Sequence, residues 1–182
     1  MKATEILKHE HQAILLVIGA AEKEVDHIEK TGQIHTQTVR EMADFFKNFL
    51  DRCHHGKEEK HLFAMMHERG VSMKTGPLDM MLHEHEQGRA FVRAVAEVVA
   101  GKTVPDAAAI RKAKENLAAY AQLLRAHIDK EDNVLYPMAD RLLKSTADQK
   151  TLTQAFDKVE SEEIGEGVHK KYHAWIEKLV GK

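Results

Sequence analysis

The sequence predicts an all-α protein, an up-down-up-down four-helix bundle with a short C-terminal helical extension. Apolar residues recur at steps of three and four along most of the chain, as on one face of an amphipathic helix. The 182 residues include only three prolines and ten glycines, so few positions oppose a helix. Four helical stretches of roughly 25–39 residues with short connections are typical of a bundle of antiparallel helices.

The first two helices are expected over residues 4–29 and 37–68. Thr4 is the candidate N-cap of the first helix, and a Thr-Gly pair follows its last turn. Thr36 or Thr38 is the candidate N-cap of the second helix, which a glycine ends.

The third and fourth helices are expected over residues 77–100 and 106–144. Pro77 stands at the first helical position, where its missing N–H has no consequence. Asp106 follows a proline and begins the fourth helix. Pro137 lies inside that helix and is expected to kink it.

Residues 1–145 are therefore expected to form the bundle, and residues 146–182 an extension packed on it. A weaker helix restarts over residues 147–163 after a Ser-Thr pair. Two nearby glycines break it, and a last short helix is expected over residues 168–179.

The charge balance and the cysteine count exclude several classes of protein. The formal net charge of −2 gives no reason to expect a nucleic acid or an anionic membrane as a partner. No apolar run is long enough to cross a membrane, and the N-terminus lacks a signal peptide. Cys53 is the single cysteine, so no internal disulfide is expected. A cytoplasmic protein is the simplest interpretation, and the sequence predicts no particular protein partner.

A repeated His-x-x-x-Glu pattern carries the functional prediction. In an α-helix, residues four apart leave the same face, so His127 and Glu131 can reach one metal ion or a pair of ions. His54 and Glu58 repeat the pattern 73 residues earlier. The stretches around His9-Glu10-His11 and His83-Glu84-His85 are related in the same way. Two copies of one helical hairpin, related by a pseudo-twofold axis, are the expected result.

Helical phase selects which of these histidines face the core. His11 and His85 share their rows with aliphatic residues, whereas His9 and His83 align with polar ones. The row of His55 is mixed and leaves its direction open. The candidate metal ligands in the bundle interior are His11, His54, Glu58, His85, His127 and Glu131. Burying these groups together is costly without a cation, which favours a divalent metal pair.

These motifs resemble the hemerythrin-like family of His-His-Glu (HHE) cation-binding bundles over about residues 4–144. The resemblance implies a non-haem di-iron site with an oxo or hydroxo bridge, although zinc or manganese also suits these ligands. It implies that His11 and His54 hold one iron, that His85 and His127 hold the other, and that Glu58 and Glu131 bridge both. Open coordination positions would then accept a small diatomic or peroxide ligand.

The sequence departs from the oxygen-carrying hemerythrins in two places. These proteins carry a second histidine four residues from the one on the third helix, where this chain has Met81 and Arg89. Their fourth-helix carboxylate is an Asp five residues on, whereas Glu131 stands four residues after His127. The chain is more similar to bacterial di-iron proteins linked to iron handling, nitric oxide or peroxide. Repair proteins for iron centres usually have a cysteine-containing N-terminal segment, which this sequence does not show, so a repair role is not expected.

Three functions remain open at this point. The chain is expected to be a di-iron protein that senses or handles oxygen, nitric oxide, peroxide or iron. The alternatives are a di-iron enzyme acting on peroxide or a small oxidisable substrate, and a bundle in which zinc or iron is structural.

Several other residues have two possible roles. His169 and His173, with Tyr172 and Glu163 nearby, either close the site as a lid or belong to a capping helix with solvent-facing histidines; the second is favoured. The extra acidic residues Glu59 and Asp132 are expected to support the ligands or face solvent, and Cys53 is expected to be a small packed residue. The only candidates that the sequence offers for a dedicated proton donor are Tyr172, His169 and His173.

Overall fold

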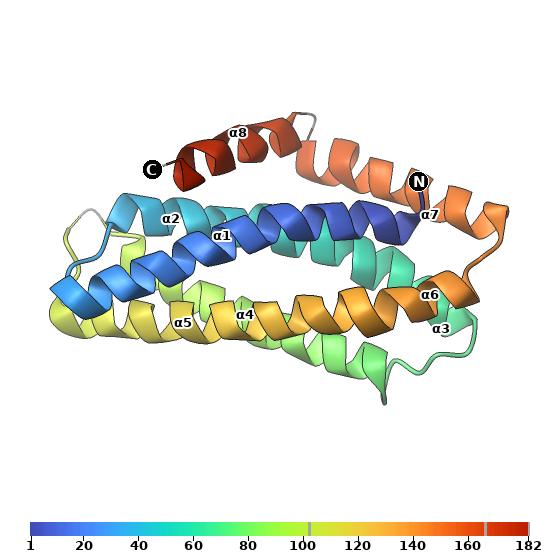
Figure 1. Ribbon diagram of the computed structural model, residues 1–182, viewed down its shortest axis with the longest axis horizontal. Coiled ribbons are helices and arrows are strands. Elements are labelled where there is room, and N and C mark those ends of the chain that lie inside the picture. The colour runs from blue at the N-terminus through green and yellow to red at the C-terminus, as the bar shows by residue number, and fades with distance from the viewer. Residues whose placement is uncertain (102, 166, 182) are drawn as a thin grey trace.

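The structure, a computed structural model, describes residues 1–101, 103–165 and 167–181, and these residues form helices without any β-strand. The predicted all-α class is therefore confirmed. Four long helical segments lie side by side, and the C-terminal helices run along one side of them (Figure 1). The first segment is α1 (Ala3–Thr31). The second contains α2 (Thr36–Phe45), η1 (Phe46–His55), η2 (Glu58–Leu62) and α3 (Phe63–Glu68). The third is α4 (Pro77–Val99). The fourth contains α5 (Ala107–Lys130), η3 (Glu131–Leu135) and α6 (Tyr136–Leu142), and the extension contains α7 (Thr146–Lys158), η4 (Val159–Gly165) and α8 (Val168–Val180).

Local sequence signals explain most of the helix ends. Gly32 closes α1 in the left-handed conformation with φ 69°, which glycine adopts without strain. Asp106 caps α5 by accepting a hydrogen bond from the Ala109 N–H, and Ser145 caps α7 in the same way. Pro77 occupies the first turn of α4 as predicted.

The N-caps predicted for the first two helices are wrong. Thr4 lies inside α1 and is buried, and its hydroxyl donates to Asp140 Oδ1 over 2.7 Å, so it is engaged with another helix. Lys2 stands at the N-cap instead. His35, rather than Thr36 or Thr38, precedes α2, because the carboxylate of Glu24 accepts both the His35 backbone N–H and its Nδ1.

The second and fourth segments leave α-geometry where they carry candidate ligands. The elements η1, η2 and η3 are π-helical, with wider turns than an α-helix. The π turn η3 ends two residues before Pro137, which lies in the first turn of α6, and the kink expected at this proline stays a prediction. Periodicity predicted the extent of both segments but not these turns.

Two apolar clusters lie on either side of a polar layer. One contains Ile14 and Leu50, and the other contains Leu7 and Leu62. His11 lies between Leu7 and Ile14 along α1, so the candidate ligands occupy the layer between the clusters. Apolar packing above and below this layer excludes water from it and fixes the helices that carry its side chains.

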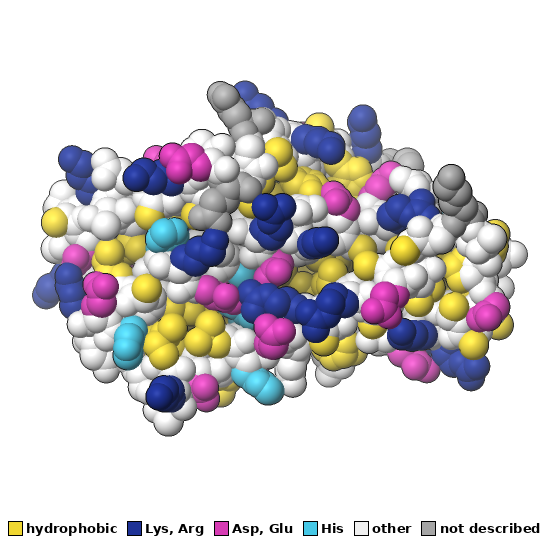
Figure 2. Space-filling model, turned by 180° about the vertical axis from the view of Figure 1, so that it is seen from behind, with side chains coloured by type: hydrophobic (Ala, Val, Ile, Leu, Met, Phe, Trp, Pro, Cys, Tyr) yellow, Lys and Arg dark blue, Asp and Glu magenta, His cyan; other side chains and the backbone are white. Residues whose placement is uncertain are grey.

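The C-terminal helices pack on the first two segments. Tyr172 of α8 donates its hydroxyl to Asp44 Oδ2 over 2.8 Å, and Trp175 Nε1 donates to Glu41 Oε2 over 3.0 Å. The α7 helix buries Phe156 in the second apolar cluster. In the described ranges, no helix combines the length and the apolar character needed to cross a membrane. Basic and hydrophobic side chains lie next to each other near the middle of the face seen from behind (Figure 2).

Candidate metal centre

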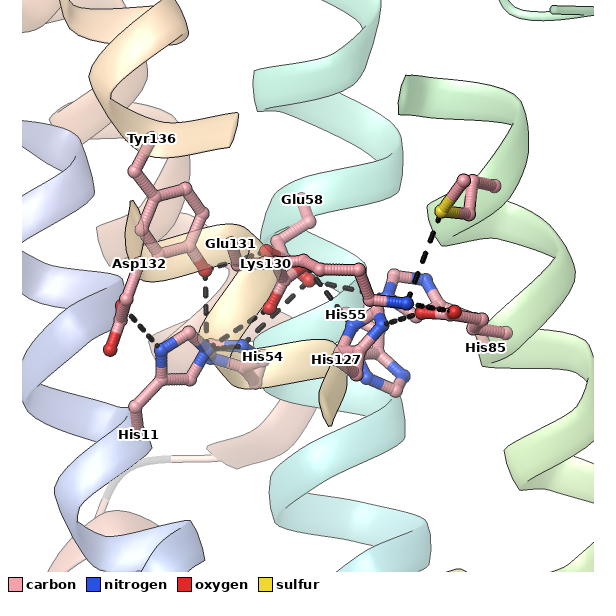
Figure 3. A network of polar contacts seen from close by, with 12 residues as sticks. His11, His54, His55, Glu58, His85, His127, Lys130, Glu131, Asp132 and Tyr136 are labelled. Atoms are coloured by element: carbon pink, nitrogen blue, oxygen red, sulfur yellow. Dashed lines mark hydrogen bonds and ion pairs between the residues drawn. The ribbon is translucent and has the colours of Figure 1, made fainter. Parts of the chain in front are cut away.

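Four histidines from four helical segments converge in the polar layer (Figure 3). His11, His54, His85 and His127 are each at most 2% exposed. Their Nε2 atoms meet in pairs, 3.0 Å apart for His11 and His54 and 3.1 Å apart for His85 and His127. Two nitrogens at about 2.1 Å from one ion and at right angles lie about 3 Å from each other. Each pair therefore has the spacing of two ligands on one metal ion.

Glu131 spans the two histidine pairs. Its Oε2 lies 3.2 Å from His11 Nε2, and its Oε1 lies 3.1 Å from His127 Nε2. The side chain is fully buried, and neither oxygen has a hydrogen-bond partner among the described residues. A buried carboxylate without a donor is expensive unless a cation lies between its oxygens and the histidines.

Glu58 faces the same space from η2. Its Oε2 lies 3.7 Å from His54 Nε2 and 3.5 Å from His85 Nε2, one histidine from each pair. This oxygen also lacks a hydrogen-bond partner within the described part of the chain, whereas Oε1 accepts the hydroxyl of Tyr136 over 2.7 Å. The carboxylate is thus held by one oxygen and presents the other to the centre.

The two carboxylates oppose each other electrostatically. Burial, followed by the charge of Glu131, raises the pKa of Glu58 well above its usual value. Burial acts in the same direction on Glu131, but the neighbouring His127 and His11 outweigh it and hold the pKa of Glu131 well below its usual value. In the absence of a cation, one carboxylate of the pair therefore keeps a proton. Bound cations would allow both carboxylates to ionise, so the donor set fits a pair of metal ions.

Carboxylates also hold the outer nitrogen of each of the four paired histidines, His11, His54, His85 and His127. Each Nδ1 lies 2.7–2.9 Å from a carboxylate oxygen of a different helical segment. The pairs are Glu10 with His54, Glu59 with His85, Glu84 with His127, and Asp132 with His11. Each carboxylate contacts the histidine of the next segment around the bundle. Asp132 of the fourth segment contacts His11 of the first, so the four contacts close into a ring. A hydrogen bond at Nδ1 fixes the ring orientation and leaves Nε2 as the donor atom for a metal.

Two side chains make the centre asymmetric. Tyr136 stacks on His11, with ring centroids 5.4 Å apart, whereas the repeat places Phe63 at the matching position beside His85. His55 stacks on His85 on the other side, where the repeat has Ile128. One half of the centre therefore has a phenol and the other has a fifth imidazole.

His55 belongs to the centre, although its direction was left open from the sequence. The donor atoms of His55, Glu58, His85 and His127 lie within 4.8 Å of one another, and His11, His54 and Glu131 form a second such group. His55 is 3% exposed, and burial, followed by the neighbouring His85, holds its pKa well below the usual value. A neutral imidazole at this place can donate a lone pair to a metal.

Behind His54, a buried lysine connects the centre to the C-terminal extension. Lys57 is completely buried and pairs with Glu10, which holds His54, and with Glu160 of η4. Burial opposes a low pKa for Glu10, but the hydrogen bond to His54 and the charge of Lys57 outweigh it and lower the pKa to about 2. Cys53 contacts His169 Nε2 over 3.3 Å beside this pair, and burial raises the thiol pKa to about 12. The ammonium group of Lys57 thus balances the negative charges of Glu10 and Glu160.

The extension residues have mixed outcomes. His169 is half-buried against Cys53, so the expectation of solvent-facing histidines is wrong for it, whereas His173 is exposed. Tyr172 packs and hydrogen-bonds to Asp44, away from the centre. The side chain of Glu163 lies outside the described residues.

All six candidate ligands come together in the layer, and their roles as ligands remain a prediction. His9 and His83 are exposed as expected, and Glu59 and Asp132 support histidines. Sequence reasoning missed the supporting role of Glu10 and Glu84, although their spacing of 74 residues marks them as a repeat pair. It also missed the proton-bearing Tyr136.

Comparison with known proteins gives a family-model match and distant relatives. The family model of the hemerythrin HHE cation binding domain matches residues 2–139. An uncharacterized protein of Mycobacterium tuberculosis is 22% identical over 164 residues, which cover 90% of this chain and 63% of the relative. A protein of Edwardsiella ictaluri named as the iron-sulfur cluster repair protein YtfE is 27% identical over 134 residues, 72% of this chain and 59% of the relative. The chain thus spans less than two thirds of the length of these relatives. No solved structure matches.

Proposed function

Because the chain belongs to the hemerythrin HHE cation-binding domain family, we propose that its polar layer holds a non-haem di-iron centre that binds a small diatomic molecule or peroxide. The observation that carries the proposal is the set of three buried carboxylate oxygens without hydrogen-bond partners among the described residues, facing four Nε2 atoms. Imidazole with carboxylate is a donor set that suits iron.

The histidine pairs suggest how the ligands divide. His11 and His54 would hold one ion, and His85 and His127 the other, because each pair has its Nε2 atoms about 3 Å apart. Glu131 would contact both ions, which is supported by the position of its two oxygens near one histidine of each pair. Glu58 would bridge through the oxygen that faces His54 and His85.

His55 is an additional donor on the side of the second ion. Its buried ring stacks on His85, and its donor atom falls in the same group as those of Glu58, His85 and His127. The first ion has no matching imidazole, because the repeat has Ile128 at the position of His55. We therefore assign the two ions different coordination, which is a basis for different reactivity.

The biological role that we propose is the handling of iron or of small oxidants. Bound iron supplies electron transfer and a site for an exogenous ligand. The chain's own residues exclude water through the two apolar clusters and orient the imidazoles through the carboxylate ring. The likeness to a protein named for iron-sulfur cluster repair supports iron handling in the broad sense. We interpret the four long helical segments as an up-down-up-down bundle that serves this centre.

Metal analysis with optical spectroscopy tests the proposal. Protein purified from iron-replete cells should contain about two irons per chain and show near-ultraviolet absorption of a bridged ferric pair. Azide added to the ferric protein should change that spectrum. Zinc in place of iron, with no spectral change, would assign the centre a structural role instead.

Tyr136 favours an enzyme acting on peroxide as the second candidate. Its hydroxyl donates to Glu58 Oε1 over 2.7 Å and lies 3.3 Å from His11 Nε2. Burial, followed by the charges of Glu131 and Glu58, raises its pKa well above the usual value, so the phenol keeps its proton beside the centre. Tyr136→Phe should lower peroxide turnover at least about tenfold while metal content is retained. Tyr172→Phe, a remote control, should leave turnover unchanged; equal losses in both variants would remove this role.

A further inference from the structure

A cleft of about 490 Å³ lies beside the metal centre and ends at one of its histidines. It opens between the second and third helical segments, with Phe46 and Val92 on its walls, and with His55 and Tyr120 among its lining residues. This volume is in the range of sites that bind small organic molecules. His55 connects the cleft to the centre because its ring stacks on His85 with centroids 3.7 Å apart.

Tyr120 brings a phenol hydroxyl to the cleft. The side chain is only 3% exposed, yet its hydroxyl has no hydrogen-bond partner within the described ranges. Its ring packs edge-on against Phe46 and fills the space over Gly88, where an added Cβ would lie 2.8 Å from it. The neighbouring residues therefore hold the ring in place, and its hydroxyl is free to donate to a molecule in the cleft.

The charges around the cleft favour an anion. Both acidic residues that line the cleft have a cationic partner: Asp51 accepts from Arg89 Nε over 2.8 Å, and Glu97 pairs with Lys112 over 3.2 Å. Lys47 and Arg93 also line the cleft, are exposed, and form no ion pair with any residue that the structure describes. Two unpaired cations at the rim of an apolar cleft complement a carboxylate on an apolar body.

We propose that this cleft binds an amphipathic organic anion, a small apolar molecule with one carboxylate. The carboxylate lies between Lys47 and Arg93, the apolar body lies between Phe46 and Val92, and Tyr120 donates to whatever polar group the body carries. The bound molecule reaches His55, whose ring stacks on His85. The binding itself depends on the protein residues and not on a metal.

Calorimetric titration with octanoate tests the proposal. Octanoate should bind the full-length protein with and without metal, and neutral octanamide should bind at least about fivefold more weakly. Lys47→Glu with Arg93→Glu should weaken octanoate binding by about tenfold or more. Charge reversal at two exposed cations away from the cleft, Lys23→Glu with Arg111→Glu, should have little effect on octanoate binding. Ala96→Leu, which fills the cleft without touching the centre, should abolish binding.

Three results would overturn the proposal. The first is no octanoate binding at millimolar concentration by folded protein. The second is binding that disappears with the metal and is unaffected by the Lys47 and Arg93 changes, because the carboxylate would then be a metal ligand. The third is concentration-dependent self-association that Ala96→Leu abolishes, which would give the cleft to a second copy of the chain. Iron content is measured separately, so a failure of the di-iron proposal is distinguishable from all three.

Discussion

The imidazole rings of His55 and His85 lie face to face, with centroids 3.7 Å apart and an angle of 15° between their planes. Glu59 fixes His85 through its Nδ1, whereas His55 has only a long contact of 3.4 Å from its Nδ1 to Asp51. The two rings therefore form one stacked unit at the second half of the centre, and only one of them was expected to be a ligand.

His55→Phe separates stacking from metal binding. The phenyl ring preserves the apolar contact with His85 but removes the nitrogen donor, so the protein should fold with nearly unchanged thermal stability. The second iron should be lost to a chelator about 10–100-fold more readily than in the unmodified protein. Chelator competition followed by metal analysis measures this. His173→Phe is the matched control, because His173 is exposed; a loss of iron no greater than in that control would mean that His55 only packs.

Glu131→Ala should remove metal more completely than Glu59→Ala. Glu131 faces one histidine of each pair, so its loss affects both ions, whereas Glu59 only orients His85. We expect Glu131→Ala to retain less than one iron per chain, and Glu59→Ala to weaken binding by about 10–100-fold. Metal content after dialysis against a fixed chelator concentration compares them. Equal losses would indicate that Glu59 is itself a ligand, so that the ligand phase on the second segment is displaced by one residue from Glu58.

Lys57→Met should destabilise the protein much more than Lys130→Met, although the repeat makes these lysines equivalent. Lys57 is fully buried and neutralises Glu10 and Glu160, whereas Lys130 is about one-third exposed and pairs with Glu84. Removing one partner of a buried pair costs about 3–5 kcal/mol, and a partly exposed pair costs at most about 1 kcal/mol. Urea unfolding gives both values. Similar values for the two variants would show that Glu10 is protonated or hydrated in the folded state.

Glu10 should make stability depend on acid pH. The pKa of this carboxyl falls from its usual value of about 4.5 to about 2 in the folded protein, so the folded state binds its proton less readily than the unfolded state. Its stabilising contribution is therefore complete above about pH 4.5 and is lost as the pH falls toward 2. The contribution is up to about 3 kcal/mol. Urea unfolding of metal-free protein between pH 5 and pH 3 should show a steeper loss than in Glu10→Gln; parallel curves would contradict the shift.

Sequence periodicity predicted the helices and the inward histidines because both depend on a regular rotation of 100° per residue. It selected His11 over His9 and His85 over His83 correctly, since α1 and α4 are regular α-helices. His55 stayed ambiguous because η1 is π-helical there, and a wider turn lets His54 and His55 both face inward. The supporting carboxylates depend on contacts between segments, which spacing within one helix does not specify. The burial of Lys57 likewise depends on a contact with another segment, the ion pair with Glu160, which spacing within one helix does not specify.

The ring of carboxylate–histidine contacts has a consequence for the ancestry of the site. Each hairpin supplies two carboxylates and two histidines, but the contacts of Glu59 with His85 and of Asp132 with His11 cross from one hairpin to the other. A lone hairpin would leave one of its histidines without an acceptor. A hairpin paired with an identical copy would close the whole ring through two-fold symmetry. Such a centre is compatible with an origin as a homodimer that gene duplication later fused, after which Tyr136 and His55 gave the two halves different chemistry.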